Sequence, residues 1–134
     1  MYSNAAFSWL AKAFDDLRWT EANIRESVYY GACFTAQQAV EKALKAYLLV
    51  HGKRLRKVHD ISALLQMCGE IDASFLPLRE IILPLVDYYI QTRYPDAMEF
   101  MEYTREKAED ALNRAQKIVQ EVQDKIRKTD VAQT

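Results

Sequence analysis

The segment from residue 97 to residue 128 carries an apolar seam, in which apolar side chains recur at every third or fourth position from Ala108 onward. The residues of the seam are Met101, Ala108, Ala111, Leu112, Ala115, Ile118, Val119, Val122 and Ile126. Such spacing gathers them on one side of an α-helix, because the helix completes a turn about every 3.6 residues. Acidic residues crowd the start of the segment and Lys125, Arg127 and Lys128 lie at its end, which complements the helix dipole. The segment therefore predicts a long helix that buries one face against other helices.

Further segments carry the same spacing, or the residues that start and stop helices. The first expected helix begins after Ser3 or Asn4, both suitable N-caps, and reaches about Val28. The others run from Tyr30 to Val50, from Ile61 to Met67, from just after Ser74 to Thr92 and from Ala97 to Lys128. Asp60 suits the N-cap of the third helix, and Gly52 and Gly69 suit the ends of the second and third. Pro84 should kink or restart the fourth helix, because proline lacks an N–H group. No segment alternates apolar and polar residues as a half-buried strand does.

Length and composition agree with this pattern. The chain has 134 residues, half of them hydrophobic, and only three are glycine and three are proline. One domain of this size can bury a core, and so few turn residues argue against an all-β fold. We therefore expect an all-α, up-and-down bundle of four long helices plus one short helix. Residues 1–128 should form this single domain, and the tail 129–134 should fray.

Charge and cysteine content limit the classes of function. The formal net charge is −1, so no overall field draws the chain to nucleic acid or to a membrane. The longest uncharged run, Val28–Val40, is too short and too polar to span a bilayer. Cys33 and Cys68 lie in apolar runs without the spacing of a zinc site, which favours a reduced, cytoplasmic protein. The two histidines are also poorly spaced for a metal, so no metal and no cofactor is expected.

Two sets of residues predict which faces of the first two helices are buried. The stripe of the first helix comprises Phe7, Leu10, Phe14, Leu17, Ile24 and Val28, and the row of the second comprises Ala36, Ala39, Ala43 and Ala46. Small side chains in a row let another helix approach closely. Trp19 lies off the first stripe, so it contacts a neighbouring element or an interface. The alanine row and Trp19 together predict a homodimer.

A polar strip borders the alanine row on the second helix. It comprises Gln37, Gln38, Glu41 and Lys45. Glu41 and Lys45 are spaced i, i+4 in the favourable order, which contributes only a few tenths of a kcal/mol when the pair is exposed. Because they line the facing helix, Glu41 and Lys45 are secondary candidates for ligand binding.

The loop after the second helix is the most basic part of the chain. It contains His51, Lys53, Arg54, Arg56, Lys57 and His59. Arg54 and His59 pair a phosphate-holding cation with a group that moves protons, the minimum needed to cleave RNA by attack of the 2′-hydroxyl. Short Arg-to-His spacings also arise by chance in basic loops, and His59 beside Asp60 suits a helix start. The basic loop 53–57 is a candidate contact for the phosphates of RNA.

Arg93 lies among aromatic residues at the expected end of the fourth helix. It follows Tyr88 by about one helical turn and precedes Tyr94 and Asp96. An arginine in this setting can hold a phosphate while a ring stacks on a base. The alternative is structural, with Arg93 pairing with Asp96 or capping the helix. We treat Arg93, Tyr94, Asp96 and Tyr88 as the leading ligand-binding candidates.

Three stretches together resemble the HEPN domain family. They are ACFTAQQAVEKALKA at 32–46, HDI at 59–61 followed by two leucines, and TRYPD at 92–96 before the last helix. The resemblance spans about residues 5–127. It implies a four- or five-helix bundle that pairs as a homodimer. Members of the family include ribonuclease toxins, nucleotide-binding proteins and small partners of minimal nucleotidyltransferases.

The resemblance also bears on catalysis. Ribonuclease members of the family carry a histidine four to six residues after the arginine that matches Arg93, and this chain has none between Tyr94 and Phe100. The expected function is therefore nucleotide binding, or partnership with a nucleotidyltransferase in a toxin–antitoxin-type module, with weak or no catalysis. One alternative is a metal-independent ribonuclease that uses Arg93, or Arg54 with His59. Another is a purely structural homodimeric scaffold.

Overall fold

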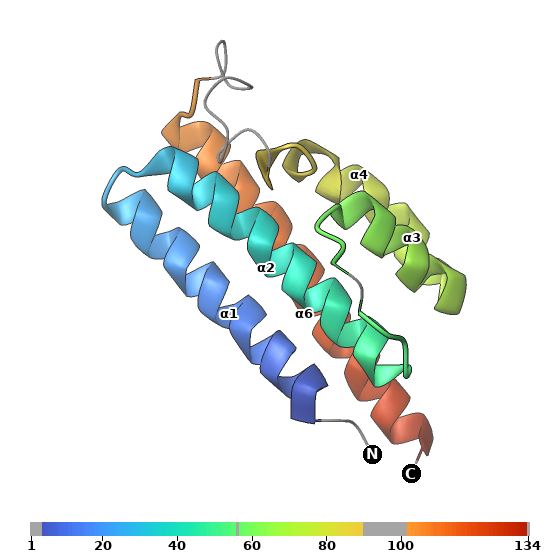
Figure 1. The fold of residues 1–134 in the computed structure, drawn as a ribbon. Helices are drawn as coiled ribbons and strands as arrows, with labels where there is room; N and C mark the ends of the chain where they lie inside the picture. The colour runs from blue at the N-terminus through green and yellow to red at the C-terminus, as the bar shows by residue number, and fades with distance from the viewer. Residues whose placement is uncertain (1–3, 56, 90–101, 134) are drawn as a thin grey trace.

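The computed structural model describes residues 4–55, 57–89 and 102–133, and all regular structure in these ranges is helical (Figure 1). The elements are α1 (Asn4–Arg25), α2 (Tyr29–Val50), α3 (Ile61–Ile71), the 3-10 helix η1 (Ala73–Leu78), α4 (Arg79–Ile82), the 3-10 helix η2 (Leu83–Leu85) and α6 (Arg105–Gln133). The all-α prediction is confirmed. Within the described ranges, no helix is both long enough and apolar enough to cross a bilayer.

Helix α2 occupies the centre of the bundle. In Figure 1, α1 lies along one side of α2, α6 lies behind it, and α3 and α4 lie along the other side. Because neighbours surround α2, its alanine row is fully buried: Ala36, Ala39, Ala43 and Ala46 all have no exposed surface. The small side chains let α1 and α6 approach within one chain. The alanine row is therefore explained by internal packing, and it gives the homodimer prediction no support.

The buried stripe of α1 keeps Leu10, Leu17 and Ile24 of the expected one, whereas Phe14 and Val28 are only partly buried and Phe7 is exposed. The buried residues are Ala6, Leu10, Ala13, Asp16, Leu17, Thr20 and Ile24. Phe7, which we expected in the core, is 54% exposed, because the smaller Ala6 takes the place against the bundle. Thr20 shows how closely α1 approaches α2, since its hydroxyl lies 2.7 Å from that of Thr35. Trp19 is 56% exposed, which agrees with its place off the stripe.

The turn between α1 and α2 ends the first helix at Arg25, earlier than the expected Val28. The backbone N–H of Ser27 donates to the carbonyl of Ile24 (3.0 Å), and that of Val28 donates to Asn23 (2.8 Å). These two bonds form a Schellman motif, in which the first donor residue after the helix end adopts a left-handed conformation. Ser27 fills that position with φ of 61°. A serine therefore holds a conformation that usually belongs to glycine.

The predicted fourth helix is a series of short pieces. Pro77 lies within η1 and Pro84 within η2, so helical hydrogen bonding stops and restarts around each proline. This confirms the expected break at Pro84 and corrects the expectation of one long helix from Ser74. The part expected beyond residue 89 lies outside the described residues.

The ends of α3 and α6 also differ from expectation. The Asp60 carboxylate accepts a bond from the Ser62 N–H (2.9 Å), as predicted for an N-cap. Gly69 does not end α3, which continues to Ile71; a side chain at position 69 would collide with Leu76. Helix α6 continues past Lys128 to Gln133, and its expected start at Ala97 lies outside the described residues. Fraying of residues 129–134 stays a prediction.

Replacing Ser27 with glycine should stabilise the fold. Glycine adopts positive φ without the steric cost that a Cβ atom imposes, although it also loses more entropy on folding. We expect a net gain of about 0.5–1 kcal/mol in the free energy of unfolding, measured by urea denaturation. Ser27→Ala is the matched control, because alanine keeps the Cβ atom. An equal gain in both variants would contradict the account of this turn.

Candidate functional site

Most of the polar strip of α2 lies inside the protein, since Gln37, Glu41 and Lys45 are buried and only Gln38 is partly exposed. Glu41 and Lys45 have side chains only 5% and 6% exposed, and Lys45 Nζ donates to Glu41 Oε2 at 3.0 Å. Gln37 beside them has no exposed surface. Trp9 of α1 covers this pair, with Lys45 Nζ 5.3 Å from the centre of the indole. Glu41 and Lys45 therefore form a buried ion pair between α1 and the loop after α2.

His59 joins this ion pair from the loop before α3. Its Nδ1 lies 3.3 Å from Glu41 Oε2, the same oxygen that Lys45 holds. The backbone carbonyl of His59 accepts a bond from Gln37 Nε2 (3.2 Å), and Gln38 in turn donates to Gln37 (2.7 Å). The strip thus fixes both the backbone and the ring of His59. Its side chain remains 47% exposed, so one edge of the imidazole faces solvent.

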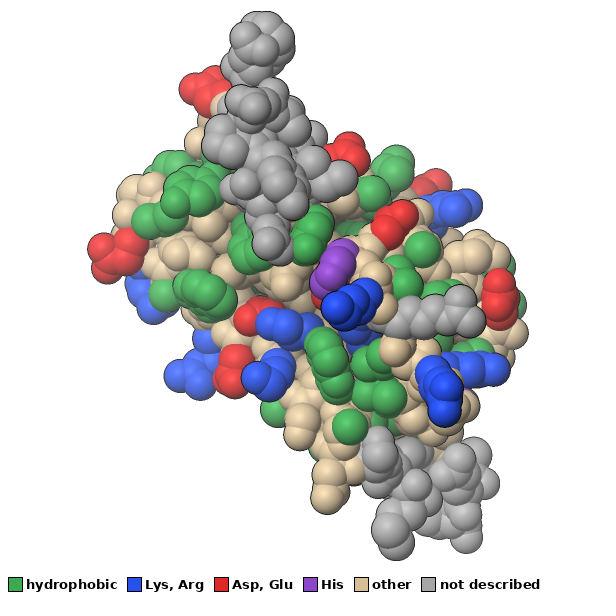
Figure 2. Space-filling view, viewed as in Figure 1, with side chains coloured by type: hydrophobic (Ala, Val, Ile, Leu, Met, Phe, Trp, Pro, Cys, Tyr) green, Lys and Arg blue, Asp and Glu red, His purple; other side chains and the backbone are tan. Residues whose placement is uncertain are grey.

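Tyr89 completes the arrangement. The rings of His59 and Tyr89 stack with their centres 4.9 Å apart and their planes 8° from parallel. A cavity of about 310 Å³ opens beside them and is lined by His59, Asp60, Val86, Asp87 and Tyr89. We call Glu41, Lys45, His59 and Tyr89, together with this cavity, the His59 site. On the face drawn in Figure 2, Lys and Arg side chains gather over α1, α2 and the following loop, beside a histidine.

The His59 site has two chemical capacities. Glu41 accepts a hydrogen bond from Nδ1 of the imidazole, and this leaves Nε2 as the nitrogen that meets a ligand. In its neutral form Nε2 accepts a proton, and in its charged form it donates a hydrogen bond to an anion. The flat surface of the His59–Tyr89 stack suits a planar ring such as a nucleobase. Within the described residues, Glu41 Oε1 is buried and has no hydrogen-bond partner.

The leading predicted residues fall in different places. Arg93, Tyr94 and Asp96 lie outside the described residues. Tyr88 points into the core, where it is 7% exposed and its ring centre lies 6.1 Å from that of Tyr103. Burial raises the pKa of Tyr88 far above its usual value, so its phenol stays protonated. The neighbouring Tyr89, which was not among the predicted binding residues, lines the cavity instead.

Arg54 is exposed in the basic loop, as are Lys53 and Lys57. In the part of the chain that is described, the side chain of His59 contacts Glu41 and Tyr89, and no contact with Arg54 is present. The predicted Arg54–His59 pair is therefore not assembled in this structure. The buried carboxylate of Glu41, 18 residues earlier in the chain, lies beside His59 where Arg54 was expected.

The two cysteines, Cys33 and Cys68, are buried and free. Burial raises the pKa of the Cys33 thiol to about 11 and that of Cys68 to about 12. Both thiols remain protonated at neutral pH, and a protonated thiol is a poor nucleophile. Neither cysteine lines the cavity of the His59 site.

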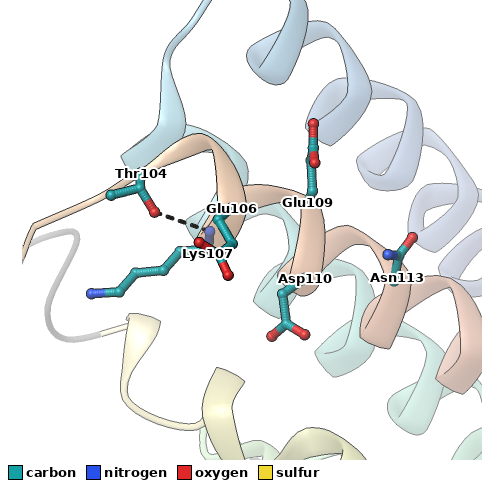
Figure 3. Close-up of a pocket in the computed structure, with 6 residues that line it drawn as sticks. All are labelled: Thr104, Glu106, Lys107, Glu109, Asp110 and Asn113. Carbon is teal, nitrogen blue, oxygen red and sulfur yellow. Dashed lines mark hydrogen bonds between the residues drawn. The ribbon is translucent and has the colours of Figure 1, made fainter.

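A second, larger cavity of about 700 Å³ lies at the start of α6 (Figure 3). Its lining residues are Thr104, Glu106, Lys107, Glu109, Asp110 and Asn113. The Thr104 hydroxyl accepts a bond from the Lys107 N–H (3.1 Å) and so caps the helix. Three carboxylates against one lysine repel an anionic ligand. The described residues include no group of side chains placed to hold a metal. The His59 site is therefore the better candidate for binding a nucleotide.

Comparisons with known proteins place the chain among proteins of similar length. The family model of the HEPN domain matches residues 6–125. A relative from Methanocaldococcus jannaschii, named "Putative toxin MJ1304", is 27% identical over 129 residues, which cover 87% of this chain and 84% of the relative. The crystal structure of TT1696 from Thermus thermophilus superposes with a TM-score of 0.82 at 39% identity, over 92% of this chain and 99% of that one. An archaeal HEPN homologue, ST0689, has a TM-score of 0.74 at 29% identity over the same shares of both chains.

The buried ion pair predicts an unusual pattern of mutant stabilities. Glu41→Leu should lower the free energy of unfolding by about 3 kcal/mol, because it strands the Lys45 ammonium in the interior. The double variant Glu41→Leu/Lys45→Met should return close to the parent, since two apolar side chains of similar volume fill the same space. Urea denaturation at neutral pH measures both. A double variant as unstable as Glu41→Leu would contradict the buried-pair description.

Proposed function

We propose a function for this chain, which belongs to the HEPN domain family: it binds a nucleotide, free or at the end of an RNA, through the His59 site. We further propose that it serves as the HEPN component of a toxin–antitoxin-type module in the cytoplasm. The observation that carries the first proposal is the half-exposed His59–Tyr89 stack, anchored on the buried Glu41–Lys45 pair. The name of the archaeal relative, which describes a toxin, supports the second.

In the proposed site, aromatic rings bind the base of the nucleotide and a positive charge binds its phosphate. The stacked rings of His59 and Tyr89 offer a base an aromatic surface, and such stacking is sequence-tolerant because every base has a π-face. Arg93 follows Tyr89 by four residues in the sequence. We propose that Arg93 holds the phosphate, with Tyr94 and Asp96 beside the ligand. Glu41 and Lys45 do not contact the ligand; Glu41 holds the ring of His59, and Lys45 pairs with Glu41.

The proposed protein is weakly catalytic or non-catalytic. The arginine that matches the ribonuclease motif of the family is Arg93, and no histidine follows it at the expected positions. A phenol or a carboxylate there titrates too far from neutrality to replace one, unless its pKa is strongly shifted. We propose that the biological output comes through a partner, either a nucleotidyltransferase or a second copy of the chain.

A specific observation favours a second candidate, a metal-independent ribonuclease. Glu41 holds Nδ1 of His59, as a carboxylate orients a catalytic imidazole, and the opposite edge of the ring is exposed. Nε2 in this position takes the proton of a 2′-hydroxyl as its oxygen attacks the adjacent phosphate. The P–O5′ bond breaks, which leaves a 2′,3′-cyclic phosphate, and the released 5′-oxygen takes a proton from water. This route uses His59 where other members of the family use a histidine after the arginine.

Removing the aromatic surface should weaken nucleotide binding. Tyr89→Ala should lower affinity for AMP or a short oligoribonucleotide about tenfold to a hundredfold, the usual effect of losing one stacking ring. Tyr89→Phe should bind like the parent, because it keeps the ring. Tyr30→Ala is the control, since Tyr30 is an exposed tyrosine elsewhere on α2. Isothermal titration calorimetry measures the four affinities, and equal binding by Tyr89→Ala would refute this site.

RNA cleavage separates the two candidate functions. The purified protein should leave a single-stranded RNA intact in EDTA, while Arg93→Ala should bind nucleotide about tenfold to a hundredfold more weakly, because a charge-assisted phosphate contact is lost. Cleavage that disappears in His59→Ala would establish the second candidate. Cleavage that disappears only in Arg93→Ala would restore the ribonuclease motif of the family. Intact binding with a lower melting temperature in Arg93→Ala would make this arginine structural.

A further inference from the structure

A separate cavity of about 400 Å³ lies where α1 meets α2 and is lined by Ser8, Trp9, Lys12 and Lys42. We call it the Trp9 cavity. None of its lining residues belongs to the His59 site. Its volume falls within the range that holds small organic ligands in proteins.

The walls of the Trp9 cavity are apolar, and its rim is positive. The indole of Trp9 supplies one wall, and its ring is held in place by Lys45 Nζ, 5.3 Å from its centre. The methylene stems of Lys12 and Lys42 can line the other walls while their ammonium groups stay near water. Lys12 makes no ion pair with any residue in the described ranges. The cavity therefore offers a flat apolar surface beside a positive charge.

Lys42 is held at the rim by a second buried carboxylate. Its Nζ forms an ion pair with Asp16, whose side chain is only 8% exposed. Burial raises the pKa of Asp16, and the bond from Lys42 opposes this rise. Such a pair contributes little net stability, because removing two charges from water costs about as much as their attraction returns. Its effect is positional: it fixes the ammonium group of Lys42, a residue that lines the cavity, and this group has three N–H bonds, of which Asp16 needs one.

We infer that the Trp9 cavity binds a small aromatic acid, a planar ring that carries one anionic group. The ring packs against Trp9, and the anionic group lies between the ammonium groups of Lys12 and Lys42. A positively charged ring compound is repelled by the same lysines. A carboxylate and a phosphate ester satisfy this chemistry equally, and the probes below distinguish them.

The chain has two tryptophans, Trp9 and Trp19, so replacing Trp19 leaves Trp9 as the one source of tryptophan fluorescence. In Trp19→Phe, the fluorescence of Trp9 alone follows binding. Phenylacetate should change it saturably, with a dissociation constant on the order of 1 mM or tighter for so small a ligand. Phenylacetamide, which has the same shape without the charge, should bind at least tenfold more weakly, and phenethylamine should not bind. Phenyl phosphate in place of phenylacetate shows which anion the cavity prefers.

A charge-removing variant keeps the cavity intact. Lys12→Met in the Trp19→Phe background should weaken phenylacetate binding about tenfold and leave phenylacetamide unchanged, because it keeps the apolar stem. Arg18→Met is the control, since Arg18 is 83% exposed on the same helix and does not line the cavity. Equal binding of acid and amide, no effect of Lys12→Met, or no saturable signal with either anion would overturn the inference. Nucleotide binding at the His59 site should be the same in parent and Lys12→Met, so the two proposals fail independently.

Discussion

One oxygen of Glu41 organises the polar interior of this bundle. Oε2 accepts the Lys45 ammonium at 3.0 Å and faces Nδ1 of His59 at 3.3 Å. Because Glu41 is buried, its charge requires both partners, and both are brought to it by different parts of the chain. Lys45 comes from the next turn of α2, and His59 comes from the loop after it. The carboxylate therefore fixes the ring of His59, while Gln37 holds the backbone of the same loop residue.

The packing of α2 explains why such a charge can be buried at all. The alanine row brings α1 and α6 close to the helix backbone, and this leaves the polar strip covered by Trp9 and by the loop. An interior carboxylate is costly and contributes little to stability, so its presence indicates a functional demand. We propose that its function is to hold the imidazole of His59 parallel to the ring of Tyr89. The Asp16–Lys42 pair repeats the arrangement at the neighbouring cavity.

The sequence predicted the helices well and their lateral packing less well. Periodicity identified α1, α2 and α6, and the Asp60 cap and the Pro84 break were both correct, because each is a local property of the chain. The helical periodicity is equally compatible with Phe7 or with Ala6 on the buried face of α1. Ala6 is the one that is buried, because α2 approaches too closely for the larger side chain. Glu41 and Lys45 were secondary ligand candidates, and nothing in the sequence of α2 itself shows that Trp9 and His59 cover them. Tyr88 and Tyr89 differ by one residue and about a quarter of a helical turn, so the choice between them needed the fold.

The most direct test of the central interaction is the protonation state of the His59 ring. Nitrogen-15 NMR at a pH where imidazoles are neutral distinguishes a ring protonated at Nδ1 from one protonated at Nε2, and His51→Gln assigns the signals of the two histidines. Because Glu41 accepts from Nδ1, His59 of the parent should carry its proton predominantly there. In Glu41→Leu/Lys45→Met, the proton should shift toward Nε2. A His59 ring protonated at Nε2 in the parent, or the same state in both proteins, would contradict the account.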